Sequence, residues 1–265
     1  GGVVAEIKVA EGDEVNAGDV LIRLDGADLS SELAIVEGKL FELFARRARL
    51  EAERDGAESI VIEGELAELV AQRKDVDELV DGQVRLFDAR LETLSKQTEQ
   101  LNRRTDQITA QITGIDAQSD ALGRQLDLIG QELEDQRSLL AKGLAQSSRV
   151  LALEREEARL MGQVGELTAS RAQSEGRITE IELEILRLEA VRREDANTQL
   201  RDIGAREREL VERRRALIDR IGRLDIRAPV SGVVLGLAVS TPRSVIRAAD
   251  PVLFVSLVLN QRLFN

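Results

Sequence analysis

The middle of this sequence repeats apolar residues every seven positions without a break. The first series is Val80, Phe87, Leu94, Leu101, Ile108, Ile115, Leu122 and Ile129. The second series is Val84, Leu91, Thr98, Thr105, Ile112, Ser119, Leu126, Leu133 and Leu140, which is polar in its middle. Two such positions in every seven form the seam of a coiled coil. This stretch is therefore predicted to be one long helix, from about 75 to 142, packed against another helix.

The segment "AKGLAQSS" (141–148) interrupts that helix. Gly143 suits the left-handed residue that ends many helices, and Lys142 favours the negative end of the helix dipole. Ser147 or Ser148 can cap a following helix. We therefore expect the chain to turn sharply here.

A further heptad pattern predicts a helix from about 148 to 224. One phase is carried by Leu153, Leu160, Leu167, Ile181 and Leu188, and a phase shifted by one residue by Ile203, Leu210, Leu217 and Leu224. Two long heptad helices joined by a tight break are expected to form an antiparallel hairpin. Its arms, of roughly 68 and 76 residues, would each be about 100–115 Å long.

An earlier helix is predicted over about 28–54, capped by Asp28 or Ser30. Stacked end-on below the hairpin, it would make the ascending arm about 40 Å too long. We therefore place it beside the base of the hairpin as a third helix. Residues 56–74 would then be a connector that returns the chain to the bottom.

The start of the following helix is predicted near Asp75. Asp75 and Glu78 have the spacing of an N-terminal capping box, with Asp in place of Ser or Thr.

The composition fits long helices and excludes several functions. Of the 265 residues 32% are charged and 2% aromatic, and the net charge is −12. An acidic chain of this kind is not expected to bind nucleic acid, because phosphate binding needs a basic face. No apolar run approaches the ~20 residues that span a bilayer, and the abrupt start suggests a fragment of a longer protein.

The sequence shows no enzyme chemistry. It contains no His and no Cys, and no phosphate-binding glycine loop accompanies its carboxylates. We therefore expect no catalytic residue, no metal site and no cofactor.

Two short β-rich segments flank the helices, at 1–25 and 226–257. The first contains "VAEGD" and "AGDVL", and the second contains "APVSGVV". Together they resemble a lipoyl/biotinyl domain split in two, with residues 26–225 inserted where a carrier displays its modified lysine. The only lysine in either half is Lys8, inside a predicted strand. No swinging arm and no acyl or carboxyl transfer is therefore expected.

A split lipoyl-like domain with a long inserted α-hairpin resembles the membrane fusion proteins, also called periplasmic adaptors. The segments "LFELFARRARLEAERDG" (40–56), "GQVRLFDARLETL" (82–94) and "LLAKGLAQSSRVLALERE" (139–156) are similar to the HlyD-like adaptors of type I secretion systems. The expected fold class is mostly α with a small β module, the hairpin and a short third helix being inserted into the split β domain.

This resemblance implies the partners and the location. A HlyD-like adaptor joins an inner-membrane ABC transporter to a TolC-like outer-membrane channel, and a secreted protein substrate passes through it. The full-length protein would be a homo-oligomer, thought to be a hexamer, in the periplasm. An inner-membrane anchor would precede residue 1, and a β-barrel domain would follow, with residues 258–265 as its possible start.

The family's hairpin tip carries an Arg, a Leu and a Ser that meet the outer-membrane channel. The candidates in this sequence, with their neighbours in the turn, are Arg137, Leu140, Lys142, Gly143, Leu144, Ser147 and Ser148. Leu140 and Ser147 keep the family spacing, whereas Arg137 is one residue too close to Leu140. Arg137 and Ser148 also fit the spacing, but Ala141 then occupies the position of the leucine. A second departure lies at 243–249, where family members carry turn-forming glycines.

Other functions stay open at this point. A drug-efflux adaptor shares the fold, although such adaptors tend to have shorter hairpins and lack the extra helix. A cytoplasmic SMC-like coiled-coil arm would need a phosphate-binding motif, which the sequence lacks. A carrier domain would need a modifiable lysine at the β-hairpin tip.

Overall fold

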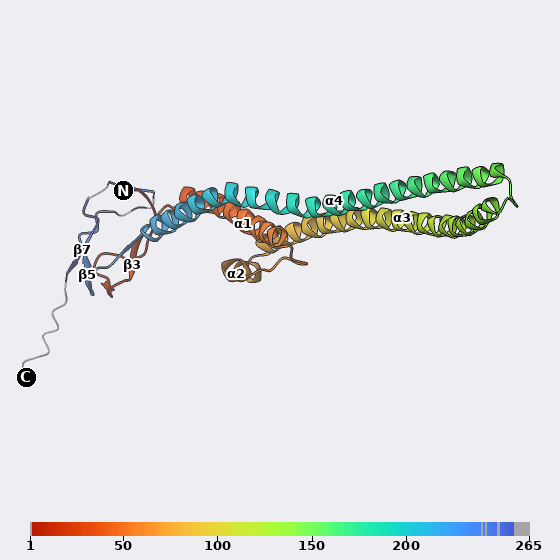
Figure 1. The fold of residues 1–265 in the computed structure, drawn as a ribbon. Helices are drawn as coiled ribbons and strands as arrows, with labels where there is room; N and C mark the ends of the chain where they lie inside the picture. Colours follow the sequence, from red (N-terminus) through yellow and green to blue (C-terminus); the bar gives the residue numbers. More distant parts are fainter. Residues whose placement is uncertain (1, 240, 242, 248–249, 257–265) are drawn as a thin grey trace, which may run out of the picture. The chain divides into compact units, whose positions relative to one another are not determined.

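The structure is a computed structural model, and it describes residues 2–239, 241, 243–247 and 250–256. The elements run in the order β1 (Gly2–Ile7), β2 (Glu14–Val15), β3 (Val20–Leu24), α1 (Ala27–Asp55), α2 (Gly64–Gln72), α3 (Lys74–Ala141), α4 (Ser147–Gly222), β4 (Asp225–Arg227), β5 (Gly232–Leu235), β6 (Val245–Ile246) and β7 (Phe254–Ser256). Figure 1 shows these elements. The expected fold class, mostly helical with a long hairpin and a small β module, is confirmed. The possible barrel strand at 258–265 lies outside the described residues.

The chain forms two compact units. The sheet unit consists of Gly1–Glu51, Val61–Gln83 and Thr198–Asn265, and the hairpin unit consists of Ala52–Ile60 and Val84–Asn197. The helices α1, α3 and α4 contribute residues to both.

In the sheet unit, strands from the two ends of the sequence pair with each other. One sheet has the order β4-β3-β1-β6 and the other has the order β2-β5-β7. The pairs β3–β4, β1–β6 and β2–β5, all antiparallel, join the first half of the β module to the second. The two halves therefore complete one folded module, although about two hundred residues separate them.

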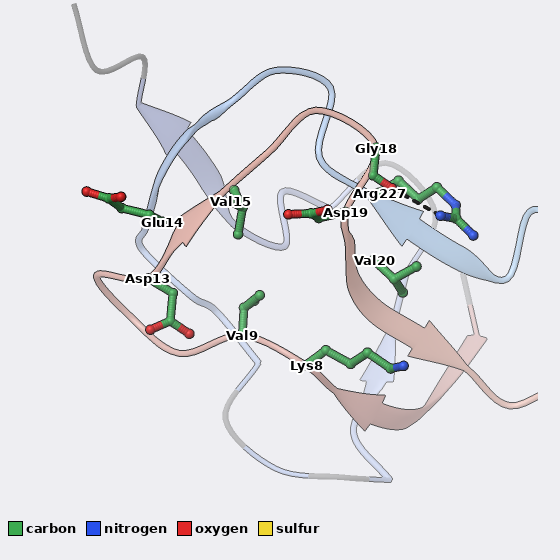
Figure 2. Close-up of a pocket in the computed structure, with 9 residues that line it drawn as sticks. All are labelled: Lys8, Val9, Asp13, Glu14, Val15, Gly18, Asp19, Val20 and Arg227. Atoms are coloured by element: carbon green, nitrogen blue, oxygen red, sulfur yellow. Dashed lines mark hydrogen bonds between the residues drawn. The ribbon is translucent and has the colours of Figure 1, made fainter. Parts of the chain in front are cut away.

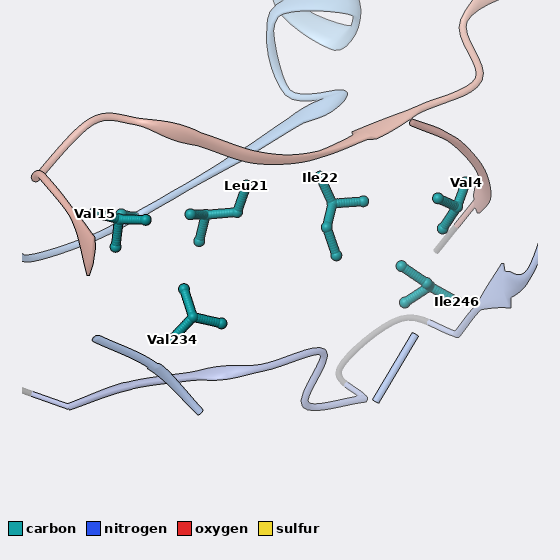
Figure 3. Close-up of a cluster of buried hydrophobic side chains, with 7 residues drawn as sticks. Val4, Val15, Leu21, Ile22, Val234 and Ile246 are labelled. Atoms are coloured by element: carbon teal, nitrogen blue, oxygen red, sulfur yellow. The ribbon is translucent and has the colours of Figure 1, made fainter. Parts of the chain in front are cut away.

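The core of this module draws on both halves. The buried residues are Val4, Val15, Leu21, Ile22, Ala228, Val234 and Ile246, six of which are labelled in Figure 3. Neither half could bury these side chains alone, which explains why short strands remain stable around a long insertion.

The helices leave and re-enter the sheet at neighbouring points. Arg23 near the end of β3 lies opposite Asp225, the first residue of β4, in the register of the two strands. Their side chains form an ion pair with an Nε–Oδ1 distance of 2.7 Å. The Arg23 hydrogen bond lowers the pKa of Asp225. A Cβ on Gly26 would lie 2.4 Å from Leu224 Cδ1, so glycine lets α1 start beside the end of α4.

Three helices pack together in the sheet unit, around Phe41 of α1. Its ring is fully buried, and the central guanidinium carbons of Arg73 and Arg214 lie 4.9 and 5.5 Å from its centroid. Both arginines also donate to Glu37, at 2.9 and 3.0 Å. This cluster ties α1 to the residue before α3 and to α4, and Arg214 reaches Glu65 of α2 as well.

The third helix, α1, therefore lies beside the hairpin arms as expected. The connector over residues 56–74, however, returns the chain only part of the way along α1 towards its first turn. Arg73 lies beside Glu37, ten residues into α1, rather than beside its first turn. The first turns of α1 contact α4 instead, where Glu32 accepts a hydrogen bond from Arg213 at 2.6 Å.

Two predicted helix caps are wrong. Helix α1 begins at Ala27, whose N–H donates to Asp25 at 3.0 Å, so neither Asp28 nor Ser30 is its cap. Helix α3 begins at Lys74, before the predicted box. There Asp75 accepts hydrogen bonds from Arg73, and Glu78 forms an ion pair with Lys74.

In the hairpin unit, α3 and α4 run antiparallel and side by side (Figure 1). Asp116 of α3 and Arg171 of α4 form an ion pair at 3.0 Å, which fixes their relative level. The polar seam residues bond within their own helices: Ser174 Oγ donates to Ser170 O, and Thr105 Oγ1 donates to Leu101 O.

The one-residue shift in the heptads of α4 coincides with the end of α1. Ala196, eight residues after Leu188, is fully buried there. The guanidinium of Arg192 lies 5.5 Å from the ring centroid of the buried Phe87. Beside Phe87, the buried Glu53 of α1 pairs with Arg90 at 3.2 Å. The shift therefore occurs where a third helix joins the coiled coil, which changes the number of neighbours that α4 must face.

Arg243 occupies the turn where the family resemblance predicts glycine. Its φ is +71°, in the left-handed region that costs an L-residue about 1 kcal/mol or more. We predict that Arg243→Gly raises the free energy of unfolding of the sheet unit by about 1 kcal/mol. Thermal melts followed by circular dichroism check this, with Arg247→Gly as the control. Equal effects of the two substitutions would contradict the prediction.

Glu11 joins the two halves through its carboxylate, which accepts backbone hydrogen bonds from Gly236 and Leu237 at 2.7 and 2.8 Å. The bond from Leu237, followed by that from Gly236, lowers the pKa of Glu11 below its usual 4.5. Since the pKa falls on folding, the stabilisation is complete above pH 4.5 and is lost as the pH drops through the lowered pKa.

We therefore predict that Glu11→Gln lowers the melting temperature at neutral pH, and that its deficit shrinks as the pH falls below 4.5. Melting curves of variant and parent across this range measure the difference. Glu14→Gln, on β2, is the control substitution. A deficit for Glu11→Gln that is independent of pH would refute the carboxylate's role.

Candidate functional site

The turn between α3 and α4 has the geometry of a Schellman motif. Leu144 N–H donates to Leu139 O and Gly143 N–H donates to Leu140 O, both at 2.9 Å. Gly143 has φ +75°, which glycine adopts at little cost. The turn is therefore built from a hydrogen-bonded backbone with glycine at its left-handed position, as the sequence predicted for Gly143.

The start of α4 differs from the prediction for the serines. Ser147 is the first residue of α4. Within the described chain, its hydroxyl accepts no hydrogen bond from a backbone N–H. Ser148 Oγ instead donates to the side-chain Oε1 of Gln146, at 3.5 Å. Both serines are exposed, so their hydroxyls remain available to a partner.

Leu140 belongs to the packing of the hairpin. It is half-buried against a cluster of Leu133, Val150 and Leu153. Since its neighbours lie on both helices, this side chain holds the two arms together just below the turn.

Two ion pairs cross the helices near the tip. Arg137 Nη2 of α3 lies 2.6 Å from Glu154 Oε1 of α4, and Arg149 of α4 pairs with Glu132 of α3. All four side chains are partly exposed to solvent, at 36–58%, so each pair contributes at most about 1 kcal/mol to stability. Arg137 is therefore a charged exposed group whose position is fixed by its own chain.

The exposed apolar group of the turn is Leu144, at 74% exposure. Leu139 is also partly exposed, and Lys142 lies between the two in sequence and is exposed. An apolar side chain displayed on a rigid turn among charged residues can contact a protein partner but supplies no reactive group.

The structure thus assigns different positions to the predicted tip residues. It gathers Lys142, Gly143 and Leu144 in the turn, places both serines at the exposed start of α4, and puts Leu140 against the core of the hairpin. The sequence reading missed Glu132, Glu154 and Arg149. In each ion pair one residue lies six and the other eleven positions from Gly143, so counting along two antiparallel arms from the turn brings these opposite charges within reach of each other.

The β module contains a hollow of about 620 Å³ (Figure 2). It is lined by Lys8, Val9, Asp13, Glu14, Val15, Gly18, Asp19, Val20 and Arg227. Two of the carboxylates that line the hollow accept hydrogen bonds within their own turns. Asp13 accepts one from the Ala10 N–H, and Asp19 accepts one from the Asn16 N–H. These groups therefore shape the module rather than offer a reactive centre.

Lys8 is not displayed as a carrier lysine would be. It follows β1 rather than lying inside the strand as predicted, and its N–H donates to Leu21 O at 2.9 Å. Its ammonium lies 3.7 Å from Glu6. The backbone of Lys8 is thus held against β3 directly after the end of β1.

Among the described residues, no three His, Cys, Asp or Glu side chains are grouped closely enough to hold a metal ion. In the same part of the chain, no helix is both long and apolar enough to cross a bilayer.

Comparison with known proteins gives a match over most of the helical part. Residues 29–220 match the family model described as "AprE, long alpha-helical hairpin". The type I secretion system membrane fusion protein PrsE of Rhizobium meliloti (strain 1021) is 42% identical over 255 residues, which are 96% of this chain and 58% of PrsE. The alkaline protease secretion protein AprE of Pseudomonas aeruginosa is 30% identical, over 96% of this chain and 59% of AprE. The chain therefore spans somewhat more than half the length of these relatives.

A solved structure supports the fold. The soluble domain of LipC, a membrane fusion protein of a type I secretion system, superposes with a TM-score of 0.86 at 24% identity. The match covers 97% of this chain and 96% of that domain.

Proposed function

Because the chain belongs to the AprE family of long α-helical hairpin proteins, we propose that it is part of a periplasmic adaptor for type I protein secretion. The observation that carries this proposal is the 42% identity to a membrane fusion protein of that system, over 96% of the chain. The chain acts by binding and positioning other proteins and is not an enzyme.

The adaptor joins an inner-membrane ABC transporter to a TolC-like outer-membrane channel, and a protein substrate passes between them. We assign the contact with the channel to the turn, with Leu144 as its apolar anchor. Arg137, Lys142, Ser147 and Ser148 add polar groups to this contact, while Gly143 and Leu140 maintain the shape of the turn. The exposure of Leu144, on a turn closed by the hydrogen bonds of Gly143 and Leu144 to Leu140 and Leu139, supports this assignment.

The full-length adaptor is anchored in the inner membrane and acts as a homo-oligomer, a hexamer in this proposal. The split β module supports this role mechanically: its two halves hold both ends of the helical insertion at neighbouring points of one sheet. A mechanical force on either helical arm is thereby transmitted to β-strands whose side chains share one hydrophobic core.

Deleting the gene in its host tests the function. We expect at least one large protein to disappear from the culture medium and to return when the full-length gene is restored. Susceptibility to small toxic compounds should not change. Unchanged secreted proteins with increased drug susceptibility would instead indicate the efflux adaptor of the same fold, and no change in either would overturn both.

A further inference from the structure

The tip of the hairpin is held together by contacts between its two arms. We call residues 132–155 the tip segment. The two ion pairs near the turn lie in it, and so do the buried residues of the cluster below the turn. The backbone hydrogen bonds of the turn close its end. The two arms are therefore fixed to each other over this segment.

Nearer the base, each helix of the hairpin is stabilised along its own length. The base segment consists of residues 88–116 of α3 and 171–195 of α4. Ion pairs there join residues three or four apart on the same helix, a spacing that stabilises a helix. They are Lys96–Glu92, Arg103–Glu99, Arg171–Glu175, Arg187–Glu184 and Arg193–Glu189. The Asp116–Arg171 pair also links the two arms where this segment approaches the tip.

Between these two segments lies a stretch with little support of either kind. We call residues 117–131 of α3 and 156–170 of α4 the joint; the Asp116–Arg171 pair places the two ranges at the same level. Among the described residues, no ion pair and no side-chain hydrogen bond connects the two helices within the joint. Its one ion pair in the described chain joins Glu156 to Arg159 on the same helix, at the edge next to the tip segment.

The packing between the arms is also incomplete in the joint. A hollow of about 390 Å³ lies there, lined from both helices by Gln118, Ala121, Leu122, Gln163, Glu166 and Leu167. Leu122 and Leu167 belong to the heptad series, yet both are only half-buried. Side chains that border a hollow lose part of their dispersion contacts. The apolar seam therefore holds the two arms together less firmly at this level.

The joint is rich in glycine. The helices of the hairpin unit contain six glycines, at Gly114, Gly123, Gly130, Gly162, Gly165 and Gly176. Four of them lie in the joint, and the other two lie within six residues of its edge. A Cβ added at any of the six would have no neighbouring described atom within 4 Å, so no contact in this chain requires glycine. Glycine weakens a helix interior because its unfolded backbone has more freedom to lose.

We propose that the joint is a hinge, about which the tip segment bends as one body relative to the base segment. Bending requires some backbone hydrogen bonds of α3 and α4 to open, and weak helix propensity with incomplete packing lowers the free energy of that opening in the joint. The contacts inside the tip segment stay intact, because they lie beyond the hinge. The inference rests on the proposed function: a tip that turns as one body can meet its partner at more than one angle without unfolding.

Distance measurements between spin labels test the hinge, because this chain has no cysteine to replace. Gln111→Cys with Glu134→Cys places one label on each side of the joint. Asp88→Cys with Gln111→Cys has the same spacing along α3 but lies in the base segment, and it is the control. All three positions are exposed. On a straight helix either pair is about 35 Å apart, which suits double electron–electron resonance on labelled full-length protein diluted with unlabelled copies.

We expect the distance distribution across the joint to be at least twice as wide as that of the control pair. Equal widths would overturn the hinge. Hydrogen exchange followed by mass spectrometry gives a second readout, in which peptides from the joint should exchange at least tenfold faster than peptides from the tip segment. Fraying that starts at the turn would produce the opposite order, and that result would also overturn the proposal.

Replacing glycines of the joint tests the cause of the bending. The joint variant combines Gly123→Ala, Gly162→Ala and Gly165→Ala. We expect it to narrow the distribution across the joint to the width of the control pair and to lower secretion at least threefold. An unchanged width would refute the role of these glycines. A narrowed distribution with normal secretion would show that secretion does not use the bend.

A matched control variant changes three helical glycines of the sheet unit. It combines Gly38→Ala, Gly82→Ala and Gly204→Ala, at positions where a Cβ has room. We expect neither the width across the joint nor secretion to change. The same narrowing in this variant would mean that the effect is not local to the joint, and the hinge would be rejected.

The outcomes separate this inference from the proposed function. If gene deletion abolishes secretion but the two distributions are equally wide, the hinge is wrong and the adaptor function stands. If the distribution across the joint is wider but deletion leaves secretion unchanged, the hinge is real and the proposed function is wrong.

Discussion

Replacing Leu144 by aspartate is expected to reduce the amount of secreted substrate at least tenfold while the protein stays folded. The side chain is 74% exposed at the turn, so its loss removes no packing within the chain. If it anchors the channel contact, its replacement costs about 2 kcal/mol, or roughly thirtyfold in the dissociation constant. Quantifying the substrate in the medium and the far-ultraviolet circular dichroism of the purified variant measures both effects.

A matched control is Ile35→Asp, which changes an aliphatic residue of 60% exposure on α1. We expect secretion to continue in this variant. Normal secretion by Leu144→Asp would show that the turn does not bind its partner through this residue, and equal losses in both variants would point to a general effect of surface charge.

Leu140 does not permit so direct a test, although the sequence named it as a contact residue. Its half-buried position against Val150 and Leu153 means that Leu140→Asp would weaken the hairpin itself. A secretion defect in that variant would therefore mix lost binding with lost packing.

The largest effect on stability is expected for Phe41→Ala. This ring is fully buried and contacts two guanidinium groups, so its removal leaves a cavity and exposes Arg73 and Arg214 to poorer packing. We predict a decrease of about 3–5 kcal/mol in the free energy of unfolding of the sheet unit. Urea titration followed by circular dichroism measures it.

Phe44→Ala serves as the control for Phe41. Phe44 lies on the same helix, 6.3 Å away between ring centroids, but is only half-buried. A loss for Phe41→Ala no larger than that for Phe44→Ala would mean that the cluster does not hold α1 to α4.

The hairpin and the split β module could be predicted from the sequence because both depend on patterns that local chemistry imposes. A heptad of apolar residues can be buried only along a second helix, which fixes a coiled coil before any contact is known. Gly143 marks the turn because its backbone conformation strains other residues. The strands could be found at both ends because their turn motifs repeat those of a known domain.

The helix caps could not be predicted in the same way. Asp28 and Asp75 stand at plausible capping positions, yet Asp25 accepts the first N–H of α1, and Arg73 takes the carboxylate of Asp75. The guanidinium of Arg73 also contacts Phe41 and Glu37, which are more than thirty residues away in the sequence, and these contacts hold it near Asp75. The spacing of residues along the chain therefore indicates which residues can cap a helix. Contacts with residues distant in the sequence decide which of them does so.

At the tip, the sequence identified the right segment without separating the roles of its leucines. Leu140 and Leu144 are chemically the same residue four positions apart. Leu140 packs against the cluster that includes Val150 and Leu153 of the opposing helix, whereas Leu144 lies in the turn after the end of α3 and is exposed to solvent. Only the pairing of the two arms decides which one a partner can reach.

The sequence by itself determined that this chain forms an antiparallel helical hairpin between two halves of one β module, since periodic apolar residues and turn-forming glycines act through neighbours close in the chain. The tertiary structure alone decided the level of the third helix and the division of the tip into packed and exposed residues. Those features depend on which distant side chains meet, and that is settled by the burial of Phe41, Phe87 and Glu53 among several helices at once.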